Sequence, residues 1–256
     1  MALNLEILSP AELTRYARQI GLEGWGRRAQ ERLKSCRVFI AGAGGLASAA
    51  AVYLLAAGVG SLRMVDRSRV SLADLNQQIL YRECDLGKVR TVIAENRLKE
   101  INPFVQVECQ ARVISEFNVC RLVSGCHLLV DATNNPATGY LLNQAALKLR
   151  VPLILGRVWE MDGCLATFWP GQGPCLACAF PEASHGGRPT APGPPLLGPL
   201  PGILGALQAL EAARILSGLP PGLLGRLVFF KGEAIQFSEK QVSINPQCLV
   251  CRSANP

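Results

Sequence analysis

The chain has 256 residues, of which 49% are hydrophobic and 18% are charged, a composition typical of a globular protein with a sizeable core. No apolar run reaches the ~18 residues that a membrane span needs, and the first residues lack the basic start and apolar core of a signal peptide. The net charge is +7, but the basic residues are dispersed and no RNA-binding signature is present. We therefore expect a cytoplasmic protein with no nucleic-acid or membrane partner.

Residues 1–35 are predicted to form an N-terminal helical region. The segment Ser9–Glu12 has the pattern of a helix start, with a serine cap, a proline at the first position and a glutamate at the third. We expect this helix to continue to Ile20 and a second helix to span Trp25 to Leu33.

A short apolar strand, a glycine-rich turn and a helix follow one another from Arg37. The turn contains Gly42, Gly44 and Gly45, and its residues Gly42, Gly44 and Ala47 fit the G-x-G-x-x-G/A pattern. Glycine permits a sharp turn and a close approach of phosphate oxygens, and the helix then points its first N–H groups at that anion. Asp66 closes the second strand, where a carboxylate that binds a ribose is expected. This unit predicts a nucleotide site; glycines that serve only close packing are the alternative.

Strands and helices continue to alternate in the next part of the chain. We expect helices over residues 88–101, 116–124 and 140–149, and strands over 104–109, 127–131 and 151–155. The alternation predicts an α/β fold with a doubly wound, mostly parallel, Rossmann-like sheet, in which residues 36–157 form the nucleotide-binding core.

Residues 158–256 are predicted to form a C-terminal lobe of different character. Cys164–Trp169 and Leu227–Phe237 have the pattern of antiparallel strands, and Ile203–Leu216 that of a strongly apolar helix. Residues 181–202 are rich in proline and glycine, so they are predicted to form a long crossover loop.

Two C-x-x-C pairs lie in this lobe, Cys175 with Cys178 and Cys248 with Cys251. Four thiolates suit a closed, tetrahedral zinc site. A cytoplasmic location also favours metal or thiol chemistry over disulfides for the ten cysteines. Unrelated core thiols are the alternative, and core packing is the default for the other six cysteines.

Together these features resemble the ThiF/MoeB family, the bacterial relatives of ubiquitin-activating enzymes. The resemblance covers nearly the whole chain and includes both cysteine pairs. The other matching segments are Arg15–Ile20, Gly42–Leu46, Ala57–Gly60, Asp66, Val70–Leu72, Ile101–Pro103, Leu197–Pro199 and Gly205–Ala212. Each motif alone is unspecific, but their combination is highly specific.

The resemblance implies a dimeric enzyme, either a homodimer or a heterodimer with another ThiF-family subunit. Such an enzyme would use ATP and Mg²⁺ to adenylate the C-terminal glycine of a ubiquitin-like protein ending in Gly-Gly, often a sulfur carrier. A carboxylate is a poor electrophile, and transfer of AMP gives it a good leaving group. Family dimers also carry an arginine finger from the N-terminal helix into the partner's ATP site, which makes Arg15 the candidate finger.

The sequence departs from the family at the groups that hold ATP and magnesium. The family's Asn-Leu-x-Arg-Gln segment has Asp74 in place of its asparagine and Gln77 in place of its phosphate-binding arginine. The catalytic lysine aligns with Arg90, unless Lys88 substitutes for it. The magnesium-binding aspartate aligns with Asn134, which keeps an oxygen ligand but loses the negative charge.

Two hypotheses follow from these departures. In the first, the chain is a divergent adenylyltransferase in which Arg90, Lys88 or Arg69 replaces the lost charges. In the second, it is a catalytically degenerate subunit of a heterodimeric activating enzyme and donates Arg15 to an active partner. A zinc-containing, NAD-binding oxidoreductase is a third hypothesis, but the two histidines of the chain fit its catalytic role poorly.

Overall fold

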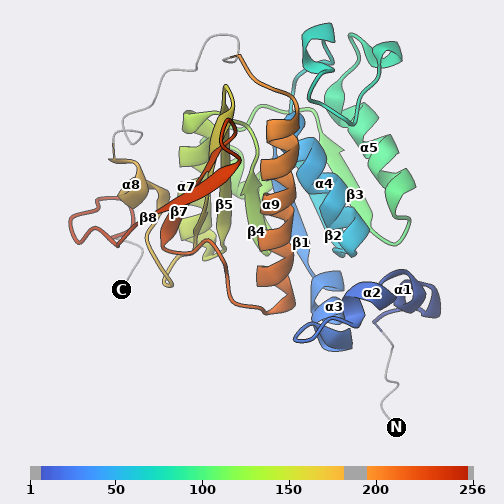
Figure 1. Ribbon diagram of the computed structural model, residues 1–256, viewed down its shortest axis with the longest axis horizontal. Coiled ribbons are helices and arrows are strands. Elements are labelled where there is room, and N and C mark those ends of the chain that lie inside the picture. Colours follow the sequence, from blue (N-terminus) through green and yellow to red (C-terminus); the bar gives the residue numbers. More distant parts are fainter. Residues whose placement is uncertain (1–6, 182–194, 253–256) are drawn as a thin grey trace.

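The computed structural model describes residues 7–181 and 195–252 and contains one eight-stranded sheet (Figure 1). The strands are β1 (Arg37–Ala41), β2 (Ser61–Val65), β3 (Gln106–Gln110), β4 (Leu128–Asp131), β5 (Leu153–Trp159), β6 (Asp162–Phe168), β7 (Arg226–Lys231) and β8 (Gln236–Gln241). Their order in the sheet is β3-β2-β1-β4-β5-β6-β7-β8. Neighbouring strands are parallel from β3 to β5 and antiparallel from β5 to β8. The predicted fold class is therefore confirmed.

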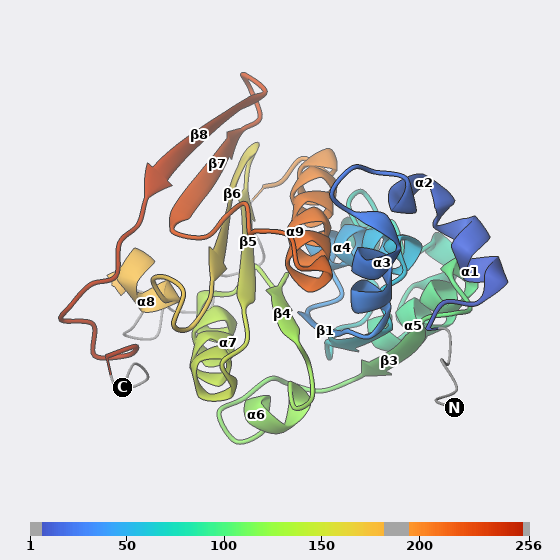
Figure 2. The same cartoon turned by 90° about the horizontal axis from the view of Figure 1, so that it is seen from below.

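Helices cover both faces of this sheet (Figure 2). One layer consists of α3 (Gly26–Lys34), α4 (Gly45–Ala57), α5 (Arg90–Ile101) and α9 (Pro199–Ser217), and the other of α6 (Val119–Leu122), α7 (Pro136–Leu149) and α8 (Leu176–Ala179). Strand β1 shows how the sheet serves both layers, because Val38 and Ile40 pack into the first core and Phe39 into the second. None of the described helices is long and apolar enough to cross a membrane.

The structure corrects the predicted bounds of several elements, including β5 (predicted over 151–155), α6 (predicted over 116–124) and α7 (predicted over 140–149). The single strand predicted over Leu227–Phe237 is wrong: β7 and β8 form a hairpin there, with a turn at residues 232–235. The apolar helix begins earlier than predicted, because α9 starts with a proline, which is favoured in a first turn. The predicted N-terminal helix is divided at Tyr16 into α1 (Pro10–Arg15) and α2 (Ala17–Ile20). Residues 182–194 of the predicted crossover loop lie outside the described residues.

The side chain of Tyr16 packs the N-terminal helices against the C-terminal end of α4. This side chain is buried, and its hydroxyl accepts a hydrogen bond from Nδ2 of Asn102 (2.8 Å). Gly58 ends α4 with a φ of +88°, and a Cβ atom there would lie 2.4 Å from the tyrosine ring. Three segments that carry the family resemblance thus meet at one contact, which gives a packing reason for the tyrosine, the glycine and the asparagine.

Candidate functional site

The glycine-rich turn lies between the carboxyl end of β1 and the start of α4. Gly42 has a φ of +96°, and a Cβ atom there would lie 2.9 Å from the carbonyl oxygen of Ala132, so only glycine fits. Gly44 is the N-cap of α4, and because glycine has no side chain it cannot cap the helix with a side-chain hydrogen bond. The first N–H groups of α4 are therefore left without a side-chain partner, beside a cavity. Such N–H groups bind anions.

Two adjoining cavities of about 620 and 410 Å³ lie at the carboxyl ends of β1, β2 and β4. They share Gly44, Arg90, Ala132 and Thr133, and we refer to the two together as the cleft. Both volumes fall within the range of small-molecule sites. Open α/β sheets bind their ligands at this edge, so the cleft is the candidate nucleotide site.

Asp66 lines the smaller cavity, and both oxygens of its carboxylate accept hydrogen bonds from the backbone. Oδ2 accepts from the N–H of Ala43 (2.8 Å) and Oδ1 from the N–H of Ser68 (2.5 Å). The first bond holds the glycine-rich turn in place. Each carboxylate oxygen keeps a second lone pair, so a ribose hydroxyl can still donate to Asp66.

Gln77 forms part of the wall of the larger cavity above the start of α4. Its Oε1 atom lies 3.1 Å from the position that a Cβ on Gly45 would occupy, and the ring of Pro201 lies 3.0 Å from that position. The neutral amide of Gln77 can donate hydrogen bonds to a phosphate but adds no charge. The contribution of α9 to this wall, through Pro201, has no signal in the local sequence.

The charged side chains of the larger cavity bind one another. Nη2 of Arg90 donates to Oδ2 of Asp74 (2.5 Å), and Nε donates to the carbonyl oxygen of Arg69 (3.1 Å). Asp74 also accepts from Oγ of Ser71 (2.6 Å). Among the described residues that line this cavity, Arg90 is the only Lys or Arg and Asp74 is the only Asp or Glu. The sequence did not indicate this pair, because its members are 16 positions apart on different segments.

Two other predicted cations lie outside the cleft. Lys88 lines neither cavity, and its ammonium group lies 3.7 Å from Asp85 on a side chain that is 54% exposed. Arg15 donates to the carbonyl oxygen of Ile101 (2.5 Å), next to Tyr16 at the far end of α4. Because α4 has 13 residues and is therefore about 20 Å long, Arg15 cannot reach the cleft of its own chain.

Asn134 lies where the larger cavity meets an apolar cavity of about 400 Å³. Its amide forms two hydrogen bonds with the backbone of Val158, donating to the carbonyl oxygen (2.8 Å) and accepting from the N–H (3.0 Å). The neighbouring Asp131 is fully buried and binds Thr133 and Arg157. Neither Asn134 nor Asp131 therefore offers a free charged ligand for a divalent cation.

The two C-x-x-C pairs meet in one cluster beside α7 and α8. The Sγ atoms of Cys175, Cys178, Cys248 and Cys251 all lie within 4.8 Å of one another. Three of the separations are 3.9, 3.7 and 3.6 Å. Tetrahedral zinc with Zn–S bonds of about 2.3 Å places its sulfurs about 3.8 Å apart, whereas a disulfide joins them at about 2.05 Å. The cluster thus fits a tetrahedral metal ion.

The surroundings of the cluster affect its thiols differently. Burial raises the pKa of Cys175. At Cys248 burial also acts to raise the pKa, but hydrogen bonds from the N–H groups of Cys251 and Val250 lower it overall. Four thiolates this close together repel one another, so full deprotonation needs a bound cation.

Comparison with known proteins supports the resemblance seen in the sequence. The ThiF family matches residues 16–250. The "Sulfur carrier protein adenylyltransferase" of Thermus thermophilus is 37% identical over 246 residues, which cover 94% of this chain and 91% of that protein. The "Adenylyltransferase and sulfurtransferase MOCS3" of Drosophila persimilis is 38% identical over 251 residues, which cover 97% of this chain and 55% of that protein. The chain thus spans about half the length of the MOCS3 relatives that it matches.

A solved structure shows the same fold at lower sequence identity. MccB of E. coli with ATP superposes with a TM-score of 0.81 over 96% of this chain and 75% of that chain, at 21% identity. The family match extends over most of the chain, and the Thermus relative matches nearly end to end. On this evidence, the chain belongs to the ThiF family.

Proposed function

We propose that the chain catalyses the ATP-dependent adenylylation of the C-terminal glycine of a ubiquitin-like sulfur carrier ending in Gly-Gly. The observation that carries this proposal is the match over 94% of the chain to a protein named sulfur carrier protein adenylyltransferase. The cleft adds support, because the helix N-terminus, Asp66 and Arg90 gather around it. The relatives' names favour this hypothesis over a degenerate, finger-donating subunit. The test is exchange of labelled pyrophosphate into ATP in the presence of the carrier.

The reaction exchanges a phosphoanhydride for a mixed anhydride. A carboxylate oxygen of the carrier's terminal glycine forms a bond to the α-phosphorus, the bond from that phosphorus to the bridging oxygen breaks, and pyrophosphate leaves with the electron pair. The carboxylate is already ionised near neutral pH, so no protein group has to accept a proton. Arg90 and the N–H groups at the start of α4 would bind the phosphates and stabilise the charge that develops on them.

Magnesium would reduce the negative charge of the triphosphate. We infer that it enters bound to ATP and is held chiefly by phosphate oxygens and water, as this ion commonly is. Asn134 would contribute at most the remaining lone pair of its amide oxygen, since that oxygen already accepts from Val158.

For the four-cysteine cluster we propose a structural zinc ion. Four thiolates close the coordination shell and leave no position for a substrate, so the ion would fasten the C-terminal lobe rather than take part in the reaction. Ten cysteines, four of them in this cluster, are also consistent with the reducing cytoplasm that we propose as the location.

Asp66→Ala should weaken ATP binding by about 1.5–3 kcal/mol, the range for a hydrogen bond to a charged group. Isothermal titration of the purified chain with ATP measures the loss. Inorganic tripolyphosphate, which has no ribose, is the matched ligand, and its binding should weaken less than that of ATP because it loses only the support that Asp66 gives to the turn. Equal weakening for the two ligands would show instead that Asp66 acts only through its bond to the turn at Ala43.

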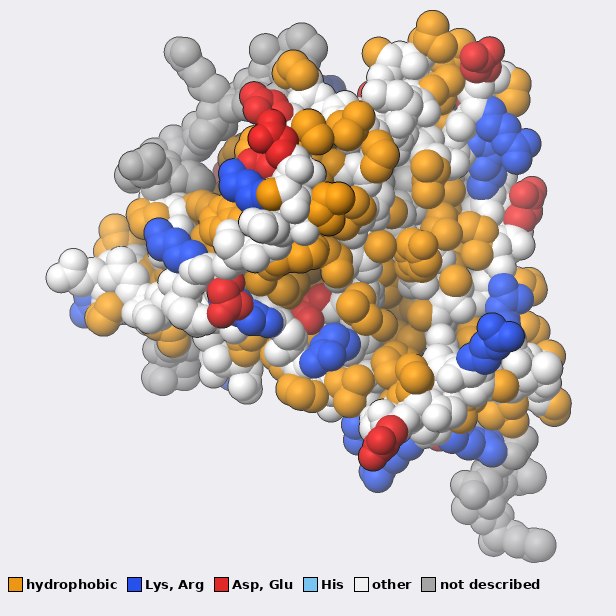
Figure 3. All heavy atoms as spheres, viewed as in Figure 1, with side chains coloured by type: hydrophobic (Ala, Val, Ile, Leu, Met, Phe, Trp, Pro, Cys, Tyr) orange, Lys and Arg blue, Asp and Glu red, His pale blue; other side chains and the backbone are white. Residues whose placement is uncertain are grey.

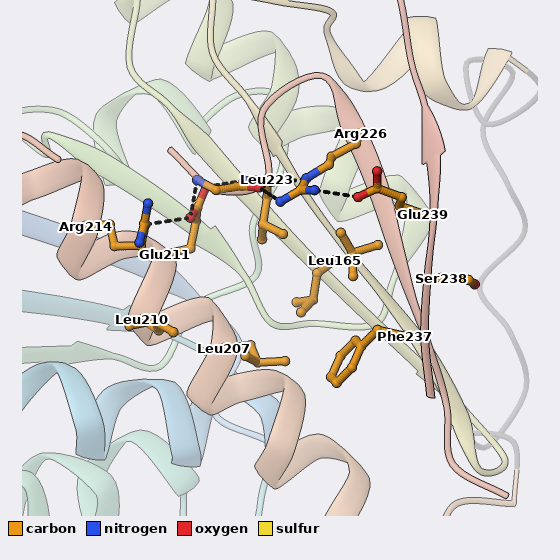
Figure 4. A pocket seen from close by; sticks show the side chains of 12 residues that line it. Leu165, Leu207, Leu210, Glu211, Arg214, Leu223, Arg226, Phe237, Ser238 and Glu239 are labelled. Atoms are coloured by element: carbon orange, nitrogen blue, oxygen red, sulfur yellow. Dashed lines mark hydrogen bonds and ion pairs between the residues drawn. The ribbon is translucent and has the colours of Figure 1, made fainter. Parts of the chain in front are cut away.

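We also propose that the enzyme is a homodimer formed across α9. Hydrophobic side chains gather over α9 and α4 (Figure 3), and Tyr53, Ile203 and Leu210 are exposed there. A groove of about 590 Å³ lies beside α9, and Leu207 and Phe237 point into it from opposite sides (Figure 4). Exposed apolar side chains that gather on one face are typical of an interaction site.

A second copy on this face would complete the cleft. The start of α9 borders the cleft through Pro201, and its end binds α3, where Arg32 donates to the carbonyl oxygen of Ser217 (3.4 Å). A two-fold axis across α9 reverses the direction of the helix in the partner. The partner's N-terminal helices would then lie beside this cleft, and its Arg15 would supply a cation that Arg15 of the same chain cannot.

Mixed dimers test this arrangement. Arg15→Ala and Arg90→Ala homodimers should both be slow, because every cleft lacks one arginine. Co-expression of the two variants should recover about one quarter of wild-type exchange, since half of randomly formed dimers are mixed and each has one complete site. Recovery no greater than the average of the separate variants would contradict a role for Arg15 across the dimer.

A further inference from the structure

We propose that Asp74 is a positioning residue that fixes the guanidinium of Arg90 in the cleft, so that the two side chains act as one unit. This inference rests on the proposed function and adds a residue to its machinery. The observation that motivates it is the hydrogen-bonded ion pair between Oδ2 of Asp74 and Nη2 of Arg90 at 2.5 Å.

The backbone holds both members of the pair in place. The N–H of Arg90 donates to the carbonyl oxygen of Ser68 (3.0 Å), and the N–H of Val70 donates to that of Lys88 (2.9 Å). Asp74 ends a short 3₁₀ helix at residues 72–74, and its carbonyl oxygen accepts from the N–H groups of Gln77 and Gln78. The segment that carries Asp74 therefore also sets the wall of the cleft.

The hydrogen bonds of Arg90 determine the direction of its remaining donors. Nε is bound to Arg69 and Nη2 to Asp74, whereas Nη1 forms no hydrogen bond with the described part of the chain. Because a guanidinium is planar, fixing two of its nitrogens also fixes the third. Arg90 lines both cavities of the cleft, so Nη1 is available there for a phosphate oxygen.

The ion pair between Arg90 and Asp74 is largely buried, so its electrostatic attraction is stronger than that of an exposed pair. The side chains of Arg90 and Asp74 are only 13% and 22% exposed, so water screens them less than an exposed pair. The family resemblance of the sequence implies an asparagine and a lysine at these two positions in other members. An ammonium is a point charge with no fork to orient, whereas a guanidinium gains from a carboxylate that sets its plane. A carboxylate at Asp74 therefore suits an arginine at position 90, just as a neutral amide suits a lysine there.

Four full-length proteins test the coupling: wild type, Asp74→Asn, Arg90→Lys and the double variant. Each single substitution should lower the maximal rate of ATP–pyrophosphate exchange by about 10- to 30-fold without raising KM for ATP, a split that a general loss of structure would not produce. The double variant should return to within about fivefold of wild type, because the ammonium needs no carboxylate to orient it. If the two losses multiply in the double variant, the side chains act independently and the proposal is overturned.

A binding measurement separates this inference from the proposed function. Isothermal titration with Mg·ATP, without a carrier, compares Asp74→Asn in the wild-type and Arg90→Ala proteins. The substitution should tighten ATP binding at least about fivefold more in the Arg90→Ala protein, where the carboxylate is unpaired and repels phosphate. An equal effect in both proteins would overturn the coupling. Coupled binding without exchange by the wild type would contradict only the proposed function.

Discussion

Replacing Arg90 by alanine should slow ATP–pyrophosphate exchange by about 100- to 1,000-fold, the usual loss for one charge contact in a transition state. Arg90 is the only Lys or Arg among the described residues that line the larger cavity, and Gln77 adds no charge beside it. The leaving pyrophosphate gains negative charge as its bond breaks, so the loss should appear mainly in the maximal rate. Exchange of labelled pyrophosphate at saturating ATP and carrier measures it.

Lys88→Ala is the matched control for this substitution. Lys88 lies two positions from Arg90 but outside both cavities, on an exposed side chain. Its removal should change the exchange rate by no more than about twofold, as expected for a surface substitution. A large loss at Lys88 together with a small loss at Arg90 would show that the lysine has replaced the family's catalytic residue.

Replacing Cys248 by serine should remove the zinc ion and destabilise the C-terminal lobe. Zinc binding supplies about 10–16 kcal/mol of folding free energy in small zinc domains. Loss of even about 3 kcal/mol of this would lower the melting temperature of a chain of this size by roughly 6–12 °C. Metal analysis after dialysis against a chelator should give about one zinc per wild-type chain and well under half for the variant.

Cys84→Ser is the control for the zinc prediction. Cys84 is exposed and lies outside the four-cysteine cluster, so the variant should keep its zinc and its melting temperature. Wild-type protein that contains no zinc, or a Cys248→Ser protein that is as stable as the control, would contradict the structural role of the ion.

The features that could be predicted from the sequence have local signals. The strand, glycine-rich turn and helix after Arg37 are adjacent in the chain, and Gly42 adopts the backbone conformation that its position in the turn indicates. Each cysteine pair is equally local, and only the meeting of the two pairs, Cys175 with Cys248 and Cys178 with Cys251, is a long-range event. Alternating strands and helices were enough to predict the fold class.

The features that escaped prediction depend on contacts between distant segments. The pairing of Asp74 with Arg90 needs the start of α5 to return beside a 3₁₀ turn. The bonds of Asn134 to Val158 need β5 to extend past the predicted strand end. The position of Arg15 could not be predicted for the same reason. Only the packing of Tyr16 against Gly58 shows that Arg15 lies at the opposite end of α4 from the cleft of its own chain.

Exchange of labelled pyrophosphate into ATP is the most direct measurement of carrier adenylylation, because it reports the reverse of the first chemical step. With the purified chain, ATP and Mg²⁺, the label should enter ATP when a ubiquitin-like carrier ending in Gly-Gly is present. A carrier that lacks the final glycine should give no exchange. If the wild-type chain exchanges nothing with any intact carrier, but does so once a second ThiF-family subunit is added, the chain is the finger-donating subunit and the proposed activity is contradicted.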